Sequence, residues 1–164
     1  MPAAGKTYWG RKIAAAYDLP FIDMDKYISQ HEQASIPALF AQYGEKGFRE
    51  REHKYLNQLI KNTKEVTVVA CGGGAPCHSG NLELMREAGE VVYLETPIAT
   101  IEDHLKQSDE IRPLLRGRAN LTAYLEDLLF KRFNYYMQAH HILPSKDIEV
   151  STFAQIIQTC TNQP

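Results

Sequence analysis

The strongest constraint on the fold is a run of branched apolar residues that stops abruptly at three glycines. Residues 66–70 read Val-Thr-Val-Val-Ala, and residues 91–94 read Val-Val-Tyr-Leu. Such runs, apolar without alternation, are typical of parallel strands, because helices cover both faces of a parallel sheet. Helical patterns separate the runs in this chain. The sequence therefore predicts an α/β fold with a mainly parallel sheet.

Shorter patterns complete the expected order of elements. Two more candidate strands lie at residues 21–22 and 148–150. Asn81 and Thr96 are the side chains best placed to cap two helices at their N-termini, and Gly89 is suited to ending the first of them. The expected helices cover residues 6–17, 44–60, 82–88, a stretch from 97 onward, 121–140 and 152–160.

Composition limits the classes of partner. The chain has 164 residues and a net charge of −2, which suits one domain without a basic surface for nucleic acid. No apolar run approaches the roughly 18 to 20 residues that span a bilayer. Three cysteines without a C-x-x-C spacing favour a reducing compartment over a disulfide framework. We therefore expect a cytoplasmic domain that binds neither nucleic acid nor membranes.

Gly5-Lys6-Thr7, followed by a helical pattern, matches the end of a phosphate-binding loop. Backbone N–H groups of such loops cradle phosphates, the lysine reaches the β- and γ-phosphates, and the threonine binds Mg²⁺. A helix start with an exposed lysine is the alternative. The full template, G-x-x-x-x-G-K-[ST], would place its first glycine one residue before Met1, and a buried strand normally precedes it. We expect a sheet that is interrupted beside the loop, or filled there by another segment.

Asp23 and Asp25 follow the first short strand. Carboxylates at the carboxyl end of a strand point toward the crevice in which α/β proteins bind ligands. One of them could hold Mg²⁺ through water while the other accepts a hydroxyl proton. Capping of the helix that begins near Lys26 is the alternative, and taken alone this pair favours capping.

Gly72, Gly73 and Gly74 directly follow the most convincing strand. Three consecutive glycines cost backbone entropy, which indicates that something approaches this backbone closely. A flexible turn is the alternative. We favour a loop that faces a ligand.

Arginines on helices form the next group of candidates. Arg49 and Glu52 share one helix face, where a guanidinium could bind a planar carboxylate, or where the two could form only a solvated ion pair. Arg132 falls on the apolar stripe of its helix, at Leu128 plus four. A cation on the inward face either extends its charged group to solvent or forms an ion pair. Pairing with the carboxylate of a ligand would explain the position of this arginine.

The polar segment from Ser108 to Arg118 contains Pro113 and Gly117 and three arginines. This composition indicates a mobile lid that carries arginine toward a ligand. A solvated basic loop is the alternative.

The order of these motifs resembles shikimate kinase along nearly the whole chain. The motifs are Gly-Lys-Thr, Asp-x-Asp, F-R-x-x-E, G-G-G-A, R-P-L-L, and an arginine followed by Tyr-Tyr in a long helix. The resemblance implies a three-layer P-loop kinase fold, a central parallel β-sheet flanked by helices, with its first strand absent from this chain. It implies one domain over residues 1–164, with a substrate-binding region at about 24–60 and a lid at about 106–119.

The same resemblance implies a reaction. The enzyme would transfer the γ-phosphoryl group of ATP to the 3-hydroxyl of shikimate, a step of the chorismate pathway to aromatic amino acids, with Mg²⁺ and as a monomer. Thr7 would ligate Mg²⁺, and Asp23 would hold it through water. Residues implied at the nucleotide are Ala3, Ala4, Gly5, Lys6, Thr7, Tyr8 and the lid arginine Arg112.

On the substrate side, the resemblance places Asp25 against the hydroxyls as base or orienter of the 3-hydroxyl. Arg49 and Arg132 would clamp the shikimate carboxylate, and Glu52 would hold Arg49 in place. The residues implied against the ring are Gly72, Gly73 and Gly74.

Two departures and two alternatives stay open. The helix before the lid often carries a nucleotide-side arginine in this family, and here only His104 or Lys106 could take its place. A related kinase for another small hydroxy acid, such as gluconate, is one alternative, although Arg49, Arg132 and the glycines argue against it. A non-catalytic module that keeps the shikimate pocket is the other.

Overall fold

Helices and strands alternate along the chain as the sequence predicts. The computed structural model describes residues 1–107 and 120–161. The strands are β1 (Phe21–Asp23), β2 (Val68–Ala70), β3 (Val92–Glu95) and β4 (His141–Pro144). The α-helices are α1 (Lys6–Ala16), α2 (Met24–Glu32), α3 (Ile36–Asn62), α4 (Asn81–Ala88), α5 (Ile98–Lys106), α6 (Leu121–Tyr136) and α7 (Ala154–Thr161). Short 3₁₀ helices are η1 (Ala75–Cys77), η3 (Ser145–Asp147) and η4 (Val150–Phe153).

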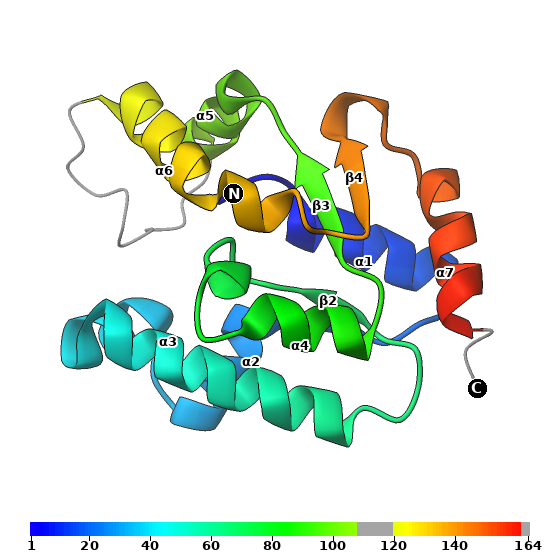
Figure 1. Cartoon of the computed structure of the whole chain (residues 1–164), viewed down its shortest axis with the longest axis horizontal. Coiled ribbons are helices and arrows are strands. Elements are labelled where there is room, and N and C mark those ends of the chain that lie inside the picture. Colours follow the sequence, from blue (N-terminus) through cyan, green and yellow to red (C-terminus); the bar gives the residue numbers. More distant parts are fainter. Residues whose placement is uncertain (108–119, 162–164) are drawn as a thin grey trace.

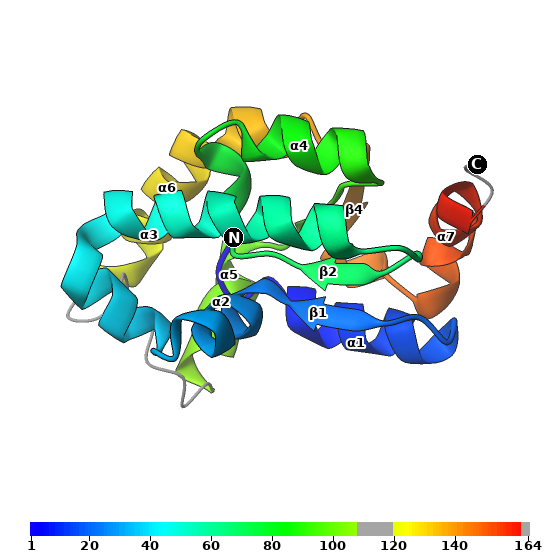
Figure 2. The same ribbon diagram turned by 90° about the horizontal axis from the view of Figure 1, so that it is seen from below.

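The strands form two parallel pairs. β1 pairs with β2, with Asp23 opposite Ala70, and β3 pairs with β4, with Glu95 opposite Pro144. Within residues 1–107 and 120–161 no strand connects β2 to β3, so the predicted interruption of the sheet is confirmed. The β3–β4 pair is seen in Figure 1, and the β1–β2 pair runs side by side in Figure 2.

Apolar packing follows the same division. One cluster of buried side chains joins α2 and α3 and includes Met24, Ile28 and Phe48. A second cluster lies between β3, α5 and α6 and includes Ile101 and Leu125, which are fully buried. The second cluster also includes Met1 and Ala4, so it anchors the N-terminal loop beside β3 and α6. Among the described helices none is long and apolar enough to cross a membrane.

A third cluster fastens α1 to both strand pairs. Ile13 of α1 packs with Leu94 of β3, and Val68 of β2 lies against the same group. Phe153 of η4 and Ile156 of α7 close it from the C-terminal side, where α7 lies beside α1 in Figure 1. This helix therefore bridges the interruption in the sheet.

The predicted helix from 44 to 60 begins earlier than expected. α3 starts at Ile36, after Ser35 caps it by accepting a hydrogen bond from the amide of Ala38. Gly44 interrupts the helix with φ 65° and ψ −176°, a left-handed conformation that glycine adopts at little cost. Residues 36–43 were missed because Pro37 and Gly44 bracket them, although proline in the first turn is compatible with a helix.

The predicted strand at 148–150 is wrong. The fourth strand is His141–Pro144, and the helix before it ends at Tyr136 rather than near residue 140. Ile148 is still buried, but it reaches the core from the irregular segment between η3 and η4. Apolar residues in a buried irregular segment resemble a strand in the sequence, because the residue types reflect burial and not the extended backbone.

Both predicted N-caps are also wrong. Gly80, with φ 70°, is the N-cap of α4, and Asn81 is the first helical residue. Pro97 is the N-cap of α5, and Oγ1 of Thr96 instead donates to the carbonyl of Ala4, 3.2 Å away. Thr96 therefore holds the N-terminal loop, and Asn81 bonds to η1 and α3 rather than capping its own helix.

Candidate active site

A single large cavity connects the segments that the sequence singles out. Its volume is about 1160 Å³, and it lies between the N-terminal loop, the end of β1, the glycine turn, α3 and α6. Every predicted site residue that the structure describes lines it: Ala3, Ala4, Gly5, Lys6, Thr7, Tyr8, Asp23, Asp25, Arg49, Glu52, Gly72, Gly73, Gly74 and Arg132. Arg112 and the rest of the predicted lid from 108 onward lie outside the described residues.

The N-terminal loop is wound into a concave shape. Ala3 and Gly5 have positive φ values of 48° and 85°. The loop's carbonyls are held from β3 and α5: Nδ1 of His104 lies 2.8 Å from the carbonyl of Ala3, and Thr96 donates to that of Ala4. Alternating backbone handedness of this kind gathers N–H groups on one side and makes an anion-binding concavity.

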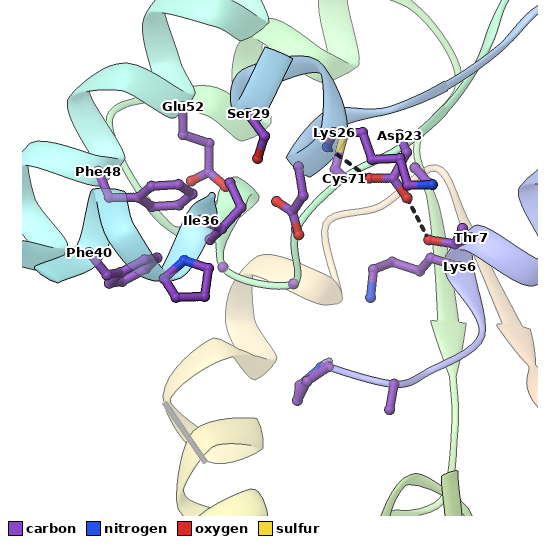
Figure 3. A pocket seen from close by; sticks show the side chains of 18 of the residues that line it. Lys6, Thr7, Asp23, Lys26, Ser29, Ile36, Phe40, Phe48, Glu52 and Cys71 are labelled. Atoms are coloured by element: carbon purple, nitrogen blue, oxygen red, sulfur yellow. Dashed lines mark hydrogen bonds between the residues drawn. The ribbon is translucent and has the colours of Figure 1, made fainter. Parts of the chain in front are cut away.

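Lys6 and Thr7 open helix α1 directly after this loop. Nζ of Lys6 donates to the carbonyl of Met1, which folds the lysine over the loop. Oγ1 of Thr7 donates to Oδ2 of Asp23, 2.9 Å away, at the end of β1 (Figure 3). The start of a helix also carries positive partial charge, so this end of the cavity suits phosphate.

Asp23 fulfils both roles that the sequence left open. Its Oδ1 accepts a hydrogen bond from the amide of Lys26 at 3.2 Å and so caps α2, while Oδ2 accepts from Thr7. The capping interpretation is therefore confirmed. It does not exclude a metal-binding role, because Oδ1 caps the helix while Oδ2 faces Thr7, and a carboxylate oxygen can accept more than one contact. Mg²⁺ bound to phosphates usually takes only one or two oxygen ligands from the protein. A threonine hydroxyl beside one carboxylate fits that pattern.

The opposite end of the cavity contains a buried ion pair. Nη1 of Arg49 lies 2.8 Å from Oε2 of Glu52, and the two side chains are only 8% and 1% exposed. Nη2 of Arg49 also reaches Glu45, whose side chain is half exposed. The alternative of a solvated pair is therefore wrong. Figure 3 shows Glu52 and Phe48 across the cavity from Lys6 and Thr7.

Burial and charge act against each other in this pair. Burial lowers the pKa of Arg49, but Glu52 and Glu45 more than offset it, so the guanidinium stays charged. Burial raises the pKa of Glu52; Arg49 opposes this and Asp25 adds to it. Among the described residues, Nε of Arg49 and Oε1 of Glu52 are buried without a hydrogen-bond partner. One donor and one acceptor of this pair thus carry a cost of burial, which the ion pair between the other two atoms offsets.

Arg132 enters the cavity from α6. It is 8% exposed, so the prediction that it faces inward is confirmed. Leu128 and Tyr124, which precede it on the same helix face, line the cavity beside it. A second buried guanidinium at the end that holds Arg49 makes this end strongly suited to an anion such as a carboxylate.

Two aromatic rings hold Arg49 in position. Phe40 and Phe48 stack with ring centroids 4.4 Å apart, and the guanidinium carbon of Arg49 lies 5.3 Å from the Phe48 centroid. Both rings line the cavity. The sequence analysis missed them. Phe48 was identifiable as the neighbour of Arg49, but Phe40 precedes the kink at Gly44, and only the folded helix brings it to the site.

The glycine turn is tight because the protein itself packs against it. A Cβ atom on Gly74 would collide with the guanidinium of Arg49, and one on Gly73 would lie 3.0 Å from the carbonyl carbon of Met1. A Cβ on Gly72 would lie 3.1 Å from Oε1 of Glu52 and 3.4 Å from Oδ1 of Asp25. The predicted close approach is confirmed, and both carboxylates converge on this turn.

Hydrogen bonds fix the turn from two sides. The hydroxyl of Tyr136 on α6 donates to the carbonyl of Gly73 at 2.7 Å, and the amide of Ala75 donates to Gly72 at 3.0 Å. Burial raises the pKa of Tyr136 to about 12, which keeps its hydroxyl a donor. Cys71, just before the turn, has its pKa raised to about 12 by burial, with Glu52 and Asp25 adding, so its thiol is neutral.

Comparisons with known proteins agree with this geometry. A family model described as shikimate kinase matches residues 2–161. The chain is 34% identical over 148 residues to the shikimate kinase of Phocaeicola vulgatus, covering 89% of this chain and 83% of that protein. It is 36% identical over 168 residues to that of Salinibacter ruber, covering 98% and 81%.

Solved structures give the same result. The crystal structure of shikimate kinase from Bacteroides thetaiotaomicron superposes with a TM-score of 0.85 at 32% identity, covering 96% of this chain and 92% of that one. Shikimate kinase from Acinetobacter baumannii in complex with shikimate superposes with a TM-score of 0.83 at 36% identity, covering 96% and 87%. The described residues therefore have the overall arrangement of solved shikimate kinases.

Proposed function

The chain belongs to the shikimate kinase family, and on that premise we propose which of its residues transfer the γ-phosphoryl group of ATP to the 3-hydroxyl of shikimate. The products are shikimate 3-phosphate and ADP, in the pathway to chorismate and the aromatic amino acids. One observation supports the assignment most strongly. A phosphate-type loop and two buried arginines line one cavity, with carboxylates between them.

ATP binds, in this proposal, at the N-terminal loop. Its β- and γ-phosphates lie on the amides of Ala3 to Thr7, and Lys6 leaves the Met1 carbonyl to reach them. Tyr8, in the first turn of α1, contributes to the same end. His104, which contacts the Ala3 carbonyl, takes the place of the nucleotide-side arginine of other family members. Arg112 remains a prediction for the transferred phosphoryl group, outside the described residues.

Mg²⁺ fits the pair formed by Thr7 and Asp23. The hydroxyl and the carboxylate oxygen already lie 2.9 Å apart, and no group of three or more acidic, histidine or cysteine side chains in residues 1–107 and 120–161 offers a rival metal site. We propose that Thr7 ligates the ion directly and Asp23 through water. The ion would neutralise charge on the phosphates, which is the larger part of catalysis in phosphoryl transfer.

Shikimate binds at the buried end. Its carboxylate lies between the guanidinium groups of Arg49 and Arg132, which both line the cavity. Glu52 positions Arg49 through its Oε2. Gly72, Gly73 and Gly74 lie against the ring, since any side chain there would displace Arg49 or the N-terminal loop. This arrangement directs the hydroxyls of the substrate toward Asp25.

Asp25 takes the proton in this proposal. The 3-hydroxyl oxygen bonds to the γ-phosphorus as the bond from that phosphorus to the bridging oxygen of ADP breaks, and the hydroxyl proton passes to Asp25. Glu52 is engaged by Arg49 and Asp23 by Thr7, so Asp25, which lies beside Gly72, is the carboxylate proposed as the base. A positioned base contributes about 10² to 10⁴ in rate.

We further propose a domain organisation, an oligomeric state and a cellular location. Residues 1–164 would form one domain that acts as a monomer, with substrate binding at about 24–60 and a lid at about 106–119. Cys71, Cys77 and Cys160 are free thiols, which suits the reducing cytoplasm.

A coupled assay of ADP release tests the function. We expect turnover that requires shikimate, ATP and Mg²⁺ together, with gluconate giving none. Calorimetric titration of ATP and of shikimate, each alone, separates binding from catalysis. Shikimate binding without ATP binding or turnover would support the non-catalytic module instead, and a preference for gluconate would overturn the substrate assignment.

A further inference from the structure

Asn81 is the most deeply buried polar side chain that the reaction leaves unexplained. It is 0% exposed, it is the first residue of α4, and it does not cap that helix. Its Nδ2 donates to the carbonyl of Ala75 at 2.9 Å, and its Oδ1 lies 2.7 Å from Nδ1 of His53. A buried amide side chain is costly unless both its amino group and its oxygen form hydrogen bonds. The two partners of Asn81 are therefore needed to keep it in this position.

The contact continues through His53 into α3. Nδ2 of Asn57, one turn along the helix, lies 3.1 Å from Nε2 of His53 and also donates to the backbone carbonyl of His53. The result is a chain of hydrogen bonds from Asn57 through His53 and Asn81 to Ala75. His53 itself is the immediate neighbour of Glu52, which holds Arg49.

The two ends of the chain determine the direction of every bond in it. A carbonyl can only accept, so Ala75 requires the amino group of Asn81 and leaves Oδ1 to face His53. The carbonyl of His53 likewise requires the amino group of Asn57. The imidazole between them must then donate from Nδ1 and accept at Nε2, which is one neutral tautomer. A doubly protonated ring would point an N–H at the amino group of Asn57.

Ala75 is the residue that ends the glycine turn. Its amide donates to the carbonyl of Gly72, and its own carbonyl receives Asn81, so both of its polar groups are used. Tyr136 holds the same turn by the carbonyl of Gly73 from the α6 side. The turn is thus held between α6 on one side and α3 with α4 on the other.

We propose that His53, through Asn81, is a positioning residue for shikimate: it holds the Ala75 carbonyl and thereby the geometry of the glycine turn. The inference rests on the proposed role of Gly72, Gly73 and Gly74 against the substrate ring. A displacement of about 1 Å in a group that positions substrate can lower the rate by about 10²-fold. Loss of the bond between His53 and Asn81 should therefore have a measurable effect on the use of shikimate.

Replacement of His53 by leucine tests the role. His53→Leu removes the donor to Asn81, and we expect the KM for shikimate to rise about tenfold while the KM for ATP stays unchanged. We expect this split because the hydrogen bonds of His53 and Asn81 join α3, α4 and the residue after the glycine turn, whereas ATP is proposed to bind at the N-terminal loop. His53→Asn places an amide Nδ2 at the same number of bonds from Cα as Nδ1 of histidine, so it restores the donor and most of the affinity.

Gln58→Leu is the matched control. Gln58 is exposed on α3, and its replacement by the same residue leaves both KM values unchanged. The inference is overturned if folded His53→Leu keeps its shikimate KM, if both KM values rise together, or if His53→Asn is no better than His53→Leu. Melting temperatures of all three variants exclude a general loss of fold.

The tautomer gives a test that needs no activity. Nitrogen-15 spectra of histidine-labelled protein should show His53 neutral with its proton on Nδ1, and Asn81→Ala should abolish that preference. A proton on Nε2 in the wild-type protein would contradict the bond directions. If the wild-type protein releases no shikimate-dependent ADP, the proposed function fails while the spectra still decide the hydrogen-bond chain. Normal turnover with an unaffected His53→Leu variant rejects the inference alone.

Discussion

The two ends of the cavity differ in how they are built. The end proposed for phosphate contains Lys6, Thr7 and Asp23, whose side chains are half-buried. The end proposed for shikimate contains Arg49, Glu52 and Arg132, which are all at most 8% exposed, and two stacked aromatic rings lie beside Arg49. The charged side chains of the first end are partly exposed, while those of the second end are buried.

The difference reflects the two ligands. ATP brings its own charge and a metal ion, so a loop of amides and one lysine is sufficient to receive it. Shikimate brings a single carboxylate and hydroxyls. A guanidinium that binds this carboxylate is buried, so the protein must offset the cost of its desolvation. We therefore expect substitutions at the phosphate end to affect rate, and those at the shikimate end to affect affinity and stability together.

The largest effect should follow Lys6→Ala. Loss of the lysine removes charge from the transferring phosphoryl group, and we expect kcat to fall about a thousandfold or more. Stability should change little because the side chain is only half-buried. Lys12→Ala, an exposed lysine on the same helix, is the control in the ADP-release assay. Turnover retained by Lys6→Ala would remove the distinction between the two ends.

Glu52→Gln should have the largest effect on stability. It leaves the guanidinium of Arg49 buried without its close partner, which costs about 3 to 5 kcal/mol. In a chain of this size that corresponds to a fall in melting temperature of roughly 10 °C. Glu45→Gln, which removes the half-exposed partner of the same arginine, should cost less than about 1 kcal/mol. Equal effects in calorimetry would show that burial does not distinguish the two contacts.

Arg132→Ala should mainly weaken shikimate binding. Removal of one of two buried guanidinium groups should lower shikimate affinity about a hundredfold and leave ATP affinity unchanged, as titration calorimetry can show. The neighbouring Lys131→Ala, whose exposed side chain pairs with Asp127, should leave both affinities as they are. Unchanged shikimate affinity in Arg132→Ala would mean that the inward position of this arginine serves packing alone.

The smallest effect concerns pH. Burial raises the pKa of Tyr136 from 10 to about 12, so its neutral form stabilises the fold fully below pH 10. That contribution, about 2.7 kcal/mol by linkage, is lost as pH rises from 10 to 12. Tyr136→Phe cannot ionise, so urea unfolding of this variant should show a shallower fall in stability over that range. An identical pH dependence in both proteins would mean that the hydroxyl is not buried in solution.

Much of the fold followed from local patterns. The strands at residues 21–22, 66–70 and 91–94 were predicted within two residues, because buried parallel strands are apolar on both faces. β4 was not predicted, because only its two central residues are apolar and they are flanked by His141 and Pro144, which are not typical of a buried strand. Its extension is imposed by pairing with β3 at the register of Val92 and His141.

The site divides in the same way. Lys6, Thr7 and Asp23 could be assigned because each belongs to a short motif with its own chemistry. Phe40 could not, because the kink at Gly44 decides which way it points. The roles of Asn81 and Thr96 were also hidden, since a polar residue before a helix has the same composition whether it caps that helix or reaches another segment.

The sequence by itself determined the α/β class, three of the four described strands, the phosphate-type loop and the residue types of the candidate site. These depend on periodicity and on short motifs, which are local. Only the tertiary structure decided that Arg49 and Glu52 are buried, that Arg132 meets them from α6, and that His53 and Asn81 reach the glycine turn. Burial and partner choice depend on which segments pack together, and residues 28 or more positions apart along the chain carry no local record of that contact.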